Sequence, residues 1–233
     1  MRMDKLLADS GYGSRKEVKK ILKTGLVTVD DKVIKDAKYQ VNPNDQEIRV
    51  GEDLVDYREE VYLMLNKPPG VISATEDSLH RTVLDLLSNE WRSYKLFPVG
   101  RLDKDTEGLL LLTTDGEFSH RLMSPRRHVS KCYQAKIEGL VTEEDVEAFS
   151  KGVQLDDGYM TKPAELVITE SADMSYIELT ITEGKFHQVK RMFKARGKTV
   201  ITLRRKSIGK LELDPELKPG EYRELTSEEL QLF

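Results

Sequence analysis

The feature that most constrains the fold is the segment 100–116, in which four consecutive leucines at 109–112 lie between polar segments bounded by glycine. A short apolar run with turn residues on both sides is typical of a buried strand. The polar residues before it, among them Arg101, Asp103 and Thr106, are therefore expected in a loop held rigidly by that strand. Rigid support behind and access in front suit a reactive carboxylate, so we expect chemistry at Asp103.

Charge is unevenly distributed along the chain. The 233 residues carry a formal net charge of −4, yet residues 1–50 contain 11 Lys or Arg against 8 Asp or Glu. Residues 185–210 contain ten basic residues and no acidic one. Two local electropositive surfaces indicate contact with phosphate backbones, and the net charge excludes a uniformly basic coat. The single cysteine, Cys132, excludes an internal disulfide. With no membrane-spanning apolar run, we expect a cytoplasmic protein without a membrane partner.

Residues 1–50 are expected to form a compact unit. Ser14 and Glu17 have the spacing of a helix capping box, and Gly25 can end that helix in the left-handed conformation. Three short strands rich in valine and isoleucine follow. Taken alone, the basic face of the helix has a solvated surface as its alternative interpretation. The whole order resembles the S4 RNA-binding fold, which implies RNA contacts on this face. The implied RNA-binding residues are Arg15, Lys16, Lys19, Lys20 and Lys23.

The remaining chain is expected to form a linker and a larger domain. Residues 51–60 are acidic without periodicity and are interpreted as the linker, followed by a second domain at 61–233. Many strands with interspersed helices, and no regular alternation of the two, indicate an α+β domain with a largely antiparallel mixed sheet and flanking helices. The expected strands are 61–65, 132–137, 176–181, 199–203 and 208–213, and the expected helices are 82–87, 142–151 and 187–196.

The pair Asp103 and Asp105 has three interpretations from its residues alone. Aspartates stabilise turns, two carboxylates can bind Mg²⁺ beside phosphates, and one carboxylate can act as a nucleophile. No further acidic cluster and no glycine-rich phosphate loop supports the magnesium site. The histidines lack zinc spacing, so no metal is expected.

Three motifs point to one family. They are Leu-Asn-Lys-Pro-x-Gly at 65–70, Gly-Arg-Leu-Asp-x-x-Thr-x-Gly-Leu-Leu-Leu-Leu-Thr-x-Asp-Gly at 100–116, and Glu-Gly-Lys-Phe-His-Gln-Val-Lys-Arg-Met-Phe at 183–193. Together with the S4-like unit they resemble the RsuA-type pseudouridine synthases over essentially the whole chain. The resemblance implies a pseudouridine synthase catalytic domain at 61–233. It also implies isomerisation of uridine to pseudouridine in RNA, a reaction that needs no cofactor.

The resemblance also implies roles for individual residues. Asp103 matches the family nucleophile, Lys190 its cationic partner, and Tyr133 the tyrosine that stacks on the target base. Without the family, an aromatic residue in a strand is more often part of a core. Asp103 could attack C1′ of the sugar, attack C6 of the base, or remove the C2′ proton, and the sequence leaves these routes open. Further substrate contacts are expected at Arg101, Arg126, Arg127, Lys185, His187, Gln188, Arg191 and Leu203.

The pair His187-Gln188 is similar to the small-subunit branch of the family, whereas large-subunit relatives tend to carry Asn-Arg there. The implied substrate is therefore 16S rRNA at uridine 516, as free RNA or in a partly assembled ribosomal particle. A synthase acting on 23S rRNA and a non-catalytic S4-type RNA-binding or assembly protein are the alternatives. Nothing in the sequence demands a dimer, so a monomer is expected.

Overall fold

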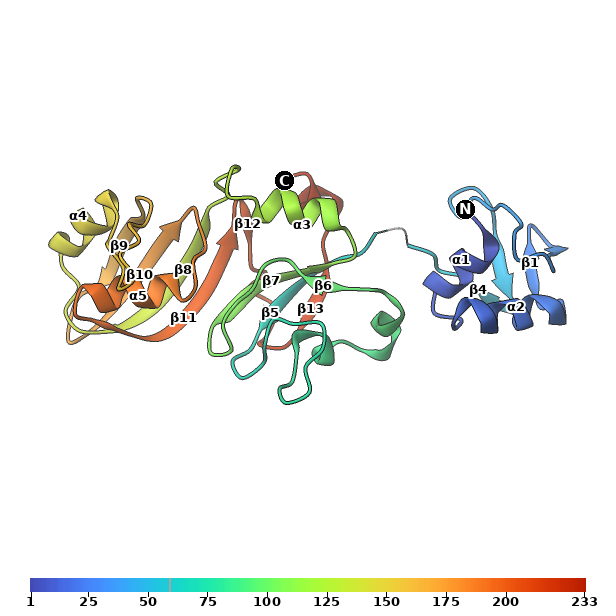
Figure 1. Ribbon diagram of the computed structural model, residues 1–233, viewed down its shortest axis with the longest axis horizontal. Coiled ribbons are helices and arrows are strands. Elements are labelled where there is room, and N and C mark those ends of the chain that lie inside the picture. The colour runs from blue at the N-terminus through green and yellow to red at the C-terminus, as the bar shows by residue number, and fades with distance from the viewer. Residues whose placement is uncertain (59) are drawn as a thin grey trace. The chain divides into compact units, whose positions relative to one another are not determined.

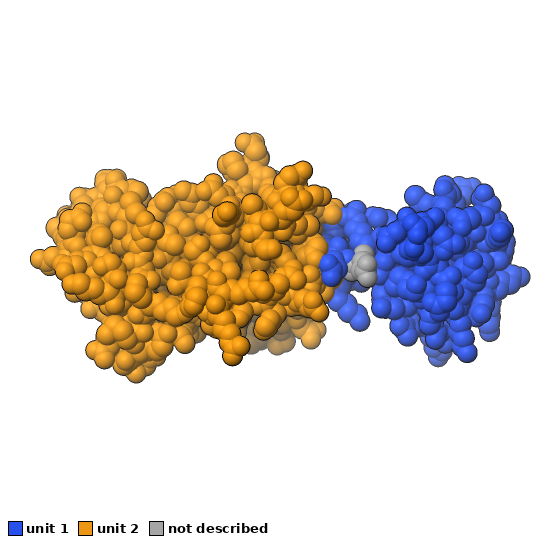
Figure 2. Space-filling view, turned by 90° about the horizontal axis from the view of Figure 1, so that it is seen from above, with its two compact units in different colours: residues 1–61, 88–96 blue, residues 62–87, 97–233 orange. Residues whose placement is uncertain are grey.

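The computed structural model describes residues 1–58 and 60–233, which divide into two compact units (Figure 1). Unit 1 comprises Met1–Val61 and Ser88–Leu96, and unit 2 comprises Tyr62–Leu87 and Phe97–Phe233 (Figure 2). Among the described residues the longest helix has 10 residues, and none has the length and apolar character of a bilayer span.

Unit 1 has the two helices and three strands expected of an S4-like fold, with a fourth strand and a 3₁₀ helix that were not expected. They are α1 (Met3–Asp9), α2 (Arg15–Thr24) and a sheet in the order β2 (Lys32–Val33), β1 (Val27–Val29), β3 (Ile48–Val50) and β4 (Asp53–Leu54), with a 3₁₀ helix η2 (Asn89–Ser93) outside the sheet. The predicted capping box is confirmed, because the Ser14 side chain and the Glu17 side chain each accept from the other residue's backbone N–H. Gly25 ends α2 with φ 82°, as predicted. Val18 and Leu22 are the face of α2 buried in the core.

The structure differs from the expected linker in the first half of 51–60. Asp53–Leu54 form β4, which pairs antiparallel with β3, and Val55 lies in the core of unit 1. Gly51, at φ 64°, makes the turn between the two strands. An acidic edge strand of two residues has too short a pattern to be recognised as a strand, which explains the difference. The division of the chain into domains at residues 50 and 60 stays a prediction.

Unit 2 is built on one mixed sheet. Its strands lie in the order β13 (Tyr222–Glu224), β5 (Tyr62–Lys67), β7 (Glu107–Thr113), β11 (Thr199–Ile208), β8 (Lys131–Glu138), β10 (Met174–Ile181) and β9 (Glu165–Glu170), with β6 (Phe97–Pro98) beside β7 and β12 (Leu211–Glu212) beside β11. The helices are η1 (Val83–Leu86), α3 (Gly116–Met123), α4 (Glu143–Lys151), α5 (Gln188–Ala195) and α6 (Ser227–Leu230). Among the described strand pairs only β7 with β11 is parallel, so the predicted α+β fold with a largely antiparallel sheet is confirmed.

The expected strand 199–203 is longer in the structure, and β12 lies within the expected strand 208–213. β11 runs without a break through 199–208, where the sequence suggested an end at Leu203. The charged residues 204–206 interrupt the apolar pattern, so the sequence does not predict that the strand continues. In the structure Arg205 is buried, and its guanidinium Nε donates to the carbonyl oxygen of Leu109 at 2.8 Å. The pairing of β11 with β8 shifts register beside Val200 and beside Arg205. The pattern of apolar residues in the sequence does not predict these two irregularities.

The leucine run is buried as predicted. Residues 109–112 lie in β7 and are each at most 1% exposed. Leu109 and Leu111 belong to a core cluster with Phe118 of α3 and Ile208 of β11. Burial of one such side chain contributes about 2 kcal/mol, so the run anchors the strand firmly. The loop before β7 is therefore attached to a strand buried in the core of unit 2.

The site lies where β7 meets β11. Their parallel pairing includes only two residue pairs, Arg204 with Glu107 and Arg205 with Gly108. Gly108 has φ 97°, and a Cβ placed there would overlap the backbone carbonyl oxygen of Arg205. Glycine is therefore required for this close approach of the two strands. Because β8 is the next strand beyond β11, the approach brings Tyr133 of β8 near the loop that precedes β7.

Candidate active site

The loop that contains Asp103 is held by hydrogen bonds from several segments. The Ser73 hydroxyl accepts from the Leu102 N–H at 3.0 Å and donates to the Leu102 carbonyl at 2.9 Å. The Gly70 N–H donates to the Lys104 carbonyl at 2.8 Å. The Thr106 N–H closes the turn on the Asp103 carbonyl at 3.1 Å. The backbone on both sides of Asp103 is thus fixed, as a pre-organised carboxylate requires.

Lys67 is a functional candidate that sequence reasoning missed. Its side chain is fully buried, and its ammonium donates to the carbonyl oxygens of Thr106 at 2.8 Å, Pro68 at 3.1 Å and Lys104 at 3.4 Å. Burial lowers the pKa of Lys67 to about 8, although Asp105 and Asp103 oppose that shift. Lys67 belongs to the motif at 65–70, which could have indicated its importance. Only the fold shows that its ammonium holds the backbone carbonyls of the loop that contains Asp103.

Asp103 faces two nitrogen groups of the α5 region. Lys190 Nζ lies 3.2 Å from Asp103 Oδ2, and His187 Nε2 lies 3.6 Å from Asp103 Oδ1. The same ammonium is 2.6 Å from Asp105 Oδ1, so Asp105 shares Lys190 with Asp103. Burial lowers the pKa of Lys190, but its hydrogen bonds to Asp105 and Asp103 outweigh burial and the net pKa is raised. Lys190 therefore remains a cation beside both carboxylates.

The start of α5 is positioned by a buried carboxylate. Glu183 accepts from the Tyr159 hydroxyl at 2.8 Å, the Lys162 N–H at 2.9 Å and Gln188 Nε2 at 2.8 Å. The Tyr159 hydroxyl, bonded to this carboxylate, has a raised pKa. His187 follows as the N-cap of α5 in the left-handed conformation, with φ 49°. Such a conformation is uncommon outside glycine and occurs where the surroundings enforce it. The network thus fixes the direction in which the His187 ring leaves the helix.

A cavity of about 100 Å³ opens in front of Asp103. It brings together most of the predicted residues of the larger domain: Arg101, Asp103, Tyr133, Lys185, His187, Gln188, Lys190 and Leu203. Thr106 and Ile181, which were not predicted as site residues, line it as well. Tyr133 is 8% exposed and comes from β8, so it presents an aromatic wall to the same space as the carboxylate. The roles of these residues stay predictions.

Other predicted residues lie elsewhere. Arg126 and Arg127 are exposed after α3 and do not line the cavity. Arg191 points away from Asp103, and its guanidinium pairs with the carboxylates of Asp156 and Asp157. The basic residues of α2 are exposed in unit 1, as expected of a helix with a solvated polar face or an RNA-binding face.

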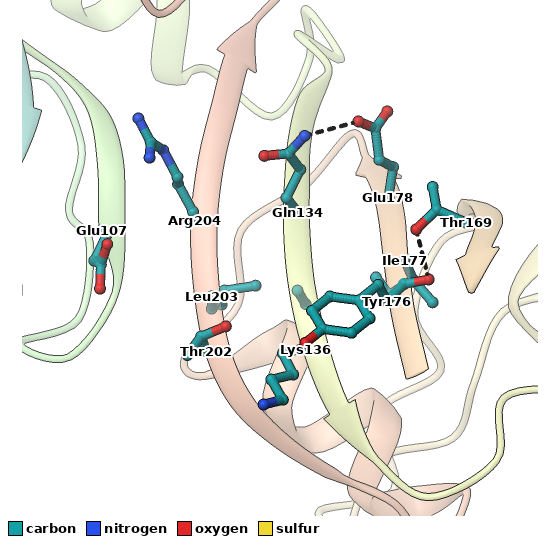
Figure 3. A pocket seen from close by; sticks show the side chains of 11 residues that line it. Glu107, Gln134, Lys136, Thr169, Tyr176, Ile177, Glu178, Thr202, Leu203 and Arg204 are labelled. Carbon is teal, nitrogen blue, oxygen red and sulfur yellow. Dashed lines mark hydrogen bonds between the residues drawn. The ribbon is translucent and has the colours of Figure 1, made fainter. Parts of the chain in front are cut away.

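A larger cavity of about 420 Å³ lies over the strands β8, β10 and β11 (Figure 3). Gln134 and Lys136 line it, and they alternate along β8 with Tyr133, so their side chains point to the opposite face of the sheet. Gln134 Nε2 donates to Glu178 Oε1 at 3.0 Å, and Lys206 Nζ donates to the same oxygen at 3.2 Å. This cavity does not contain Asp103.

The Asp103 cavity has the components for chemistry on one flat base. A carboxylate held by an ammonium can attack a carbon or accept a proton, and the Tyr133 ring can stack on the base. Within the described part of the chain, no three His, Cys, Asp or Glu side chains are grouped to hold a metal ion.

Comparison with known proteins agrees with this geometry. Residues 61–195 match the family model of RNA pseudouridylate synthases, and residues 1–46 match that of the S4 domain. The chain is 56% identical to the RNA pseudouridine synthase YtzG of Bacillus subtilis (strain 168), over 100% of this chain and 98% of the relative. It is 44% identical to ribosomal small subunit pseudouridine synthase A of Escherichia coli (strain K12), over 99% of this chain and 98% of the relative.

A solved structure gives the same result. The crystal structure of a pseudouridylate synthase has a chain that is 37% identical in sequence to this one. The two structures superpose with a TM-score of 0.70, and the match covers 100% of each chain. The match includes the strands that carry the candidate site and the unit with the S4-like elements. The chain belongs to the RNA pseudouridylate synthase family, with an S4 domain at residues 1–46.

Proposed function

We propose that this synthase converts one uridine of small-subunit rRNA to pseudouridine, with Asp103 as the nucleophile. The observation that carries the proposal is the Asp103 carboxylate, 3.2 Å from the Lys190 ammonium, in a cavity that Tyr133 also lines. The relatives named ribosomal small subunit pseudouridine synthase A, 44% identical over 99% of the chain, support the small subunit as the source of the RNA. By resemblance the target is uridine 516 of 16S rRNA.

The reaction breaks the bond between N1 and C1′, turns the uracil and joins C5 to C1′. The proton lost from C5 is balanced by the proton gained at N1, so the product is an isomer and no group donor is needed. A glycosidase uses two carboxylates because water must attack a sugar whose leaving group departs. Here the base stays bound, so one carboxylate suffices. Asp103 can attack C1′, attack C6 or take the C2′ proton, and Tyr133 holds the base in each route.

The RNA-binding part of the proposal rests on charge. The basic face of α2, together with Arg126 and Arg127, contacts RNA phosphates outside the cavity, and Lys185 contacts them at the cavity wall. Arg101, Gln188 and Leu203 contact the target nucleotide within it. The substrate is free rRNA or a partly assembled particle, the enzyme acts as a monomer, and its compartment is the cytoplasm, where bacterial ribosomes are made.

The variant Asp103→Asn tests the nucleophile. Asparagine keeps the side-chain volume but lacks a nucleophilic carboxylate, so pseudouridine formation in a 16S rRNA transcript should be abolished while RNA affinity changes little. Tritium release from transcripts labelled at uridine C5 measures the reaction. The control is Asp173→Asn, an exposed aspartate between β9 and β10, which should retain full activity. Substantial residual turnover by Asp103→Asn would contradict the assignment.

Mapping pseudouridines in rRNA from cells that lack the gene tests the substrate. Loss of one small-subunit pseudouridine, at position 516, supports the proposal. Loss of a large-subunit pseudouridine instead indicates a 23S rRNA synthase, and an unchanged map indicates a binding or assembly protein.

A further inference from the structure

Phe186 is an exposed aromatic residue next to the active site. Its side chain belongs to a residue that is 75% exposed, in the loop that leads to α5. A third cavity, of about 660 Å³, is lined by Asp156, Asp157, Phe186, His187, Lys190, Arg191 and Lys194. His187 and Lys190 line both this cavity and that of Asp103, so the two cavities adjoin at these side chains.

The backbone of Phe186 is fixed on both sides. The preceding N–H, of Lys185, donates to Gln188 Oε1 at 2.8 Å, and Gln188 is held by Glu183. The Phe186 carbonyl accepts from Arg191 Nη1 at 3.4 Å. Arg191 is itself fixed, because its Nε donates to Asp156 Oδ1 at 2.7 Å. An exposed apolar ring is therefore held at a defined place.

One face of the Phe186 ring is already stacked. The ring lies on the His187 imidazole with centroids 3.8 Å apart and an angle of 19° between the planes. His187 in turn faces Asp103, so the order outward from the carboxylate is imidazole, then phenyl ring. The outer face of the phenyl ring is open to solvent. A fixed aromatic ring with one open face is a stacking platform for a nucleobase, whichever base it is.

A cation lies on the same cavity wall. Lys194, two turns along α5, is exposed, and its ammonium pairs with no residue in the described part of the chain. Both aspartates of the wall pair with Arg191, and with Lys190 and Lys194 the formal charges of the wall sum to +1. A phosphate beside the phenyl ring would therefore meet a wall of net positive charge and an ammonium, that of Lys194, that no carboxylate of the wall already holds.

The face of the sheet in Figure 3 offers a weaker platform. Tyr176 is 42% exposed there, but the Lys136 ammonium lies 5.8 Å from its ring centroid. Gln134 and Lys206 both donate to Glu178, so this carboxylate is already paired. Tyr176 therefore provides a matched aromatic control.

We propose that Phe186 and Lys194 form a second nucleotide subsite for an unpaired nucleotide next to the target uridine. Its base stacks on the open face of Phe186, and its phosphate pairs with Lys194. This inference rests on the proposed function, because it extends the RNA substrate from one flipped base to a neighbouring nucleotide. The subsite selects RNA whose flanking nucleotide is unpaired, since a base in a duplex cannot reach the phenyl ring.

Kinetics of full-length variants test the subsite. Loss of one base stack should raise KM about tenfold for Phe186→Ala, with little change in kcat, because the ring does not reach the reacting atoms. Phe186→Tyr should restore the wild-type KM. Tyr176→Ala should behave as wild type, and Lys194→Gln should raise KM and reduce the salt slope of RNA affinity by about one.

Cross-linking supplies a readout that does not depend on turnover. A small-subunit RNA fragment with 5-iodouridine on either side of the target uridine is bound to the enzyme and irradiated, and cross-linked peptides are mapped by mass spectrometry. We expect a cross-link at Phe186 that is lost in Phe186→Ala.

Three results would overturn the inference: an unchanged KM for Phe186→Ala, a fall in kcat alone that Phe186→Tyr does not rescue, or cross-links only at other residues. An inactive wild-type enzyme contradicts the proposed function, and the cross-link map still decides on the subsite.

Discussion

Replacing Lys67 by methionine separates the support of the Asp103 loop from the stability of the fold. Methionine has a similar length and no charge, so it fills the buried space without an ammonium. Lys67 donates to the carbonyl oxygens of Thr106, Pro68 and Lys104, and the last of these also accepts from the Gly70 N–H. In the variant, the carbonyls of Thr106 and Pro68 thus lose a donor, while that of Lys104 keeps one.

The magnitudes follow from burial and from the lost hydrogen bonds. A pKa moved from 10.5 to about 8 means that the charged form of Lys67 costs the folded state about 3 kcal/mol at pH 7. Two carbonyls without a donor cost about 2 to 4 kcal/mol together. The two effects oppose each other, so the free energy of unfolding at pH 7 should change by less than about 2 kcal/mol. The rate should fall about 100-fold, because the carboxylate proposed as the nucleophile is no longer held in position.

The pH dependence has a definite sign. The folded-state pKa of Lys67, about 8, lies below the unfolded value of 10.5, so the unfolded chain binds more protons between these values. Stability from this group therefore rises with pH, by about 2 kcal/mol between pH 7 and pH 9.5. The Lys67→Met variant should lack this rise in the free energy of unfolding. The difference in that rise between wild type and variant therefore measures the contribution of Lys67 alone.

Urea unfolding at pH 7 and pH 9.5, with kcat measured by tritium release, checks these values. The reasoning is refuted if Lys67→Met keeps kcat within twofold, or if wild type and variant gain the same stability between the two pH values. A loss above about 4 kcal/mol at pH 7 would also contradict it, since the ammonium would then be a net stabiliser.

Two further predictions concern the junction of strands and the RNA-binding helix. Gly108→Ala should lower the free energy of unfolding by at least about 2 kcal/mol, because its Cβ overlaps the Arg205 carbonyl at positive φ. Gly158→Ala, also at positive φ but with no atom within 4 Å, should cost only about 1 kcal/mol in the same urea titration. Replacing the four lysines of α2 by glutamine should weaken rRNA binding and flatten its dependence on salt, measured by filter binding. An unchanged salt slope would show that α2 does not contact phosphates.

Local features of the fold could be predicted because their causes are local. The Ser14–Glu17 capping box and the left-handed Gly25 involve residues within one or two turns of each other, and both are confirmed. The four leucines at 109–112 predict a buried strand without knowledge of its neighbours. The strands β9 and β13 were missed, since each depends on pairing with a distant partner.

The candidate site shows the same division. Asp103, Tyr133 and Lys190 were selected by motifs, and the structure places all three around one cavity. Lys67 and Phe186 also lie inside those motifs. The sequence does not show that the Lys67 ammonium is buried, or that the Phe186 ring is exposed to solvent and not packed in a core.

By itself, the sequence determined the helix caps, the central apolar strand and the order of three polar motifs. These depend on neighbouring residues and on amino acid type. Only the tertiary structure decided which groups meet. Asp103 and Lys190 are 87 residues apart along the chain. They face each other because Gly108 lets β7 approach β11, and because Glu183 fixes the start of α5. Such contacts depend on strand register and long-range packing, which residue type alone does not specify.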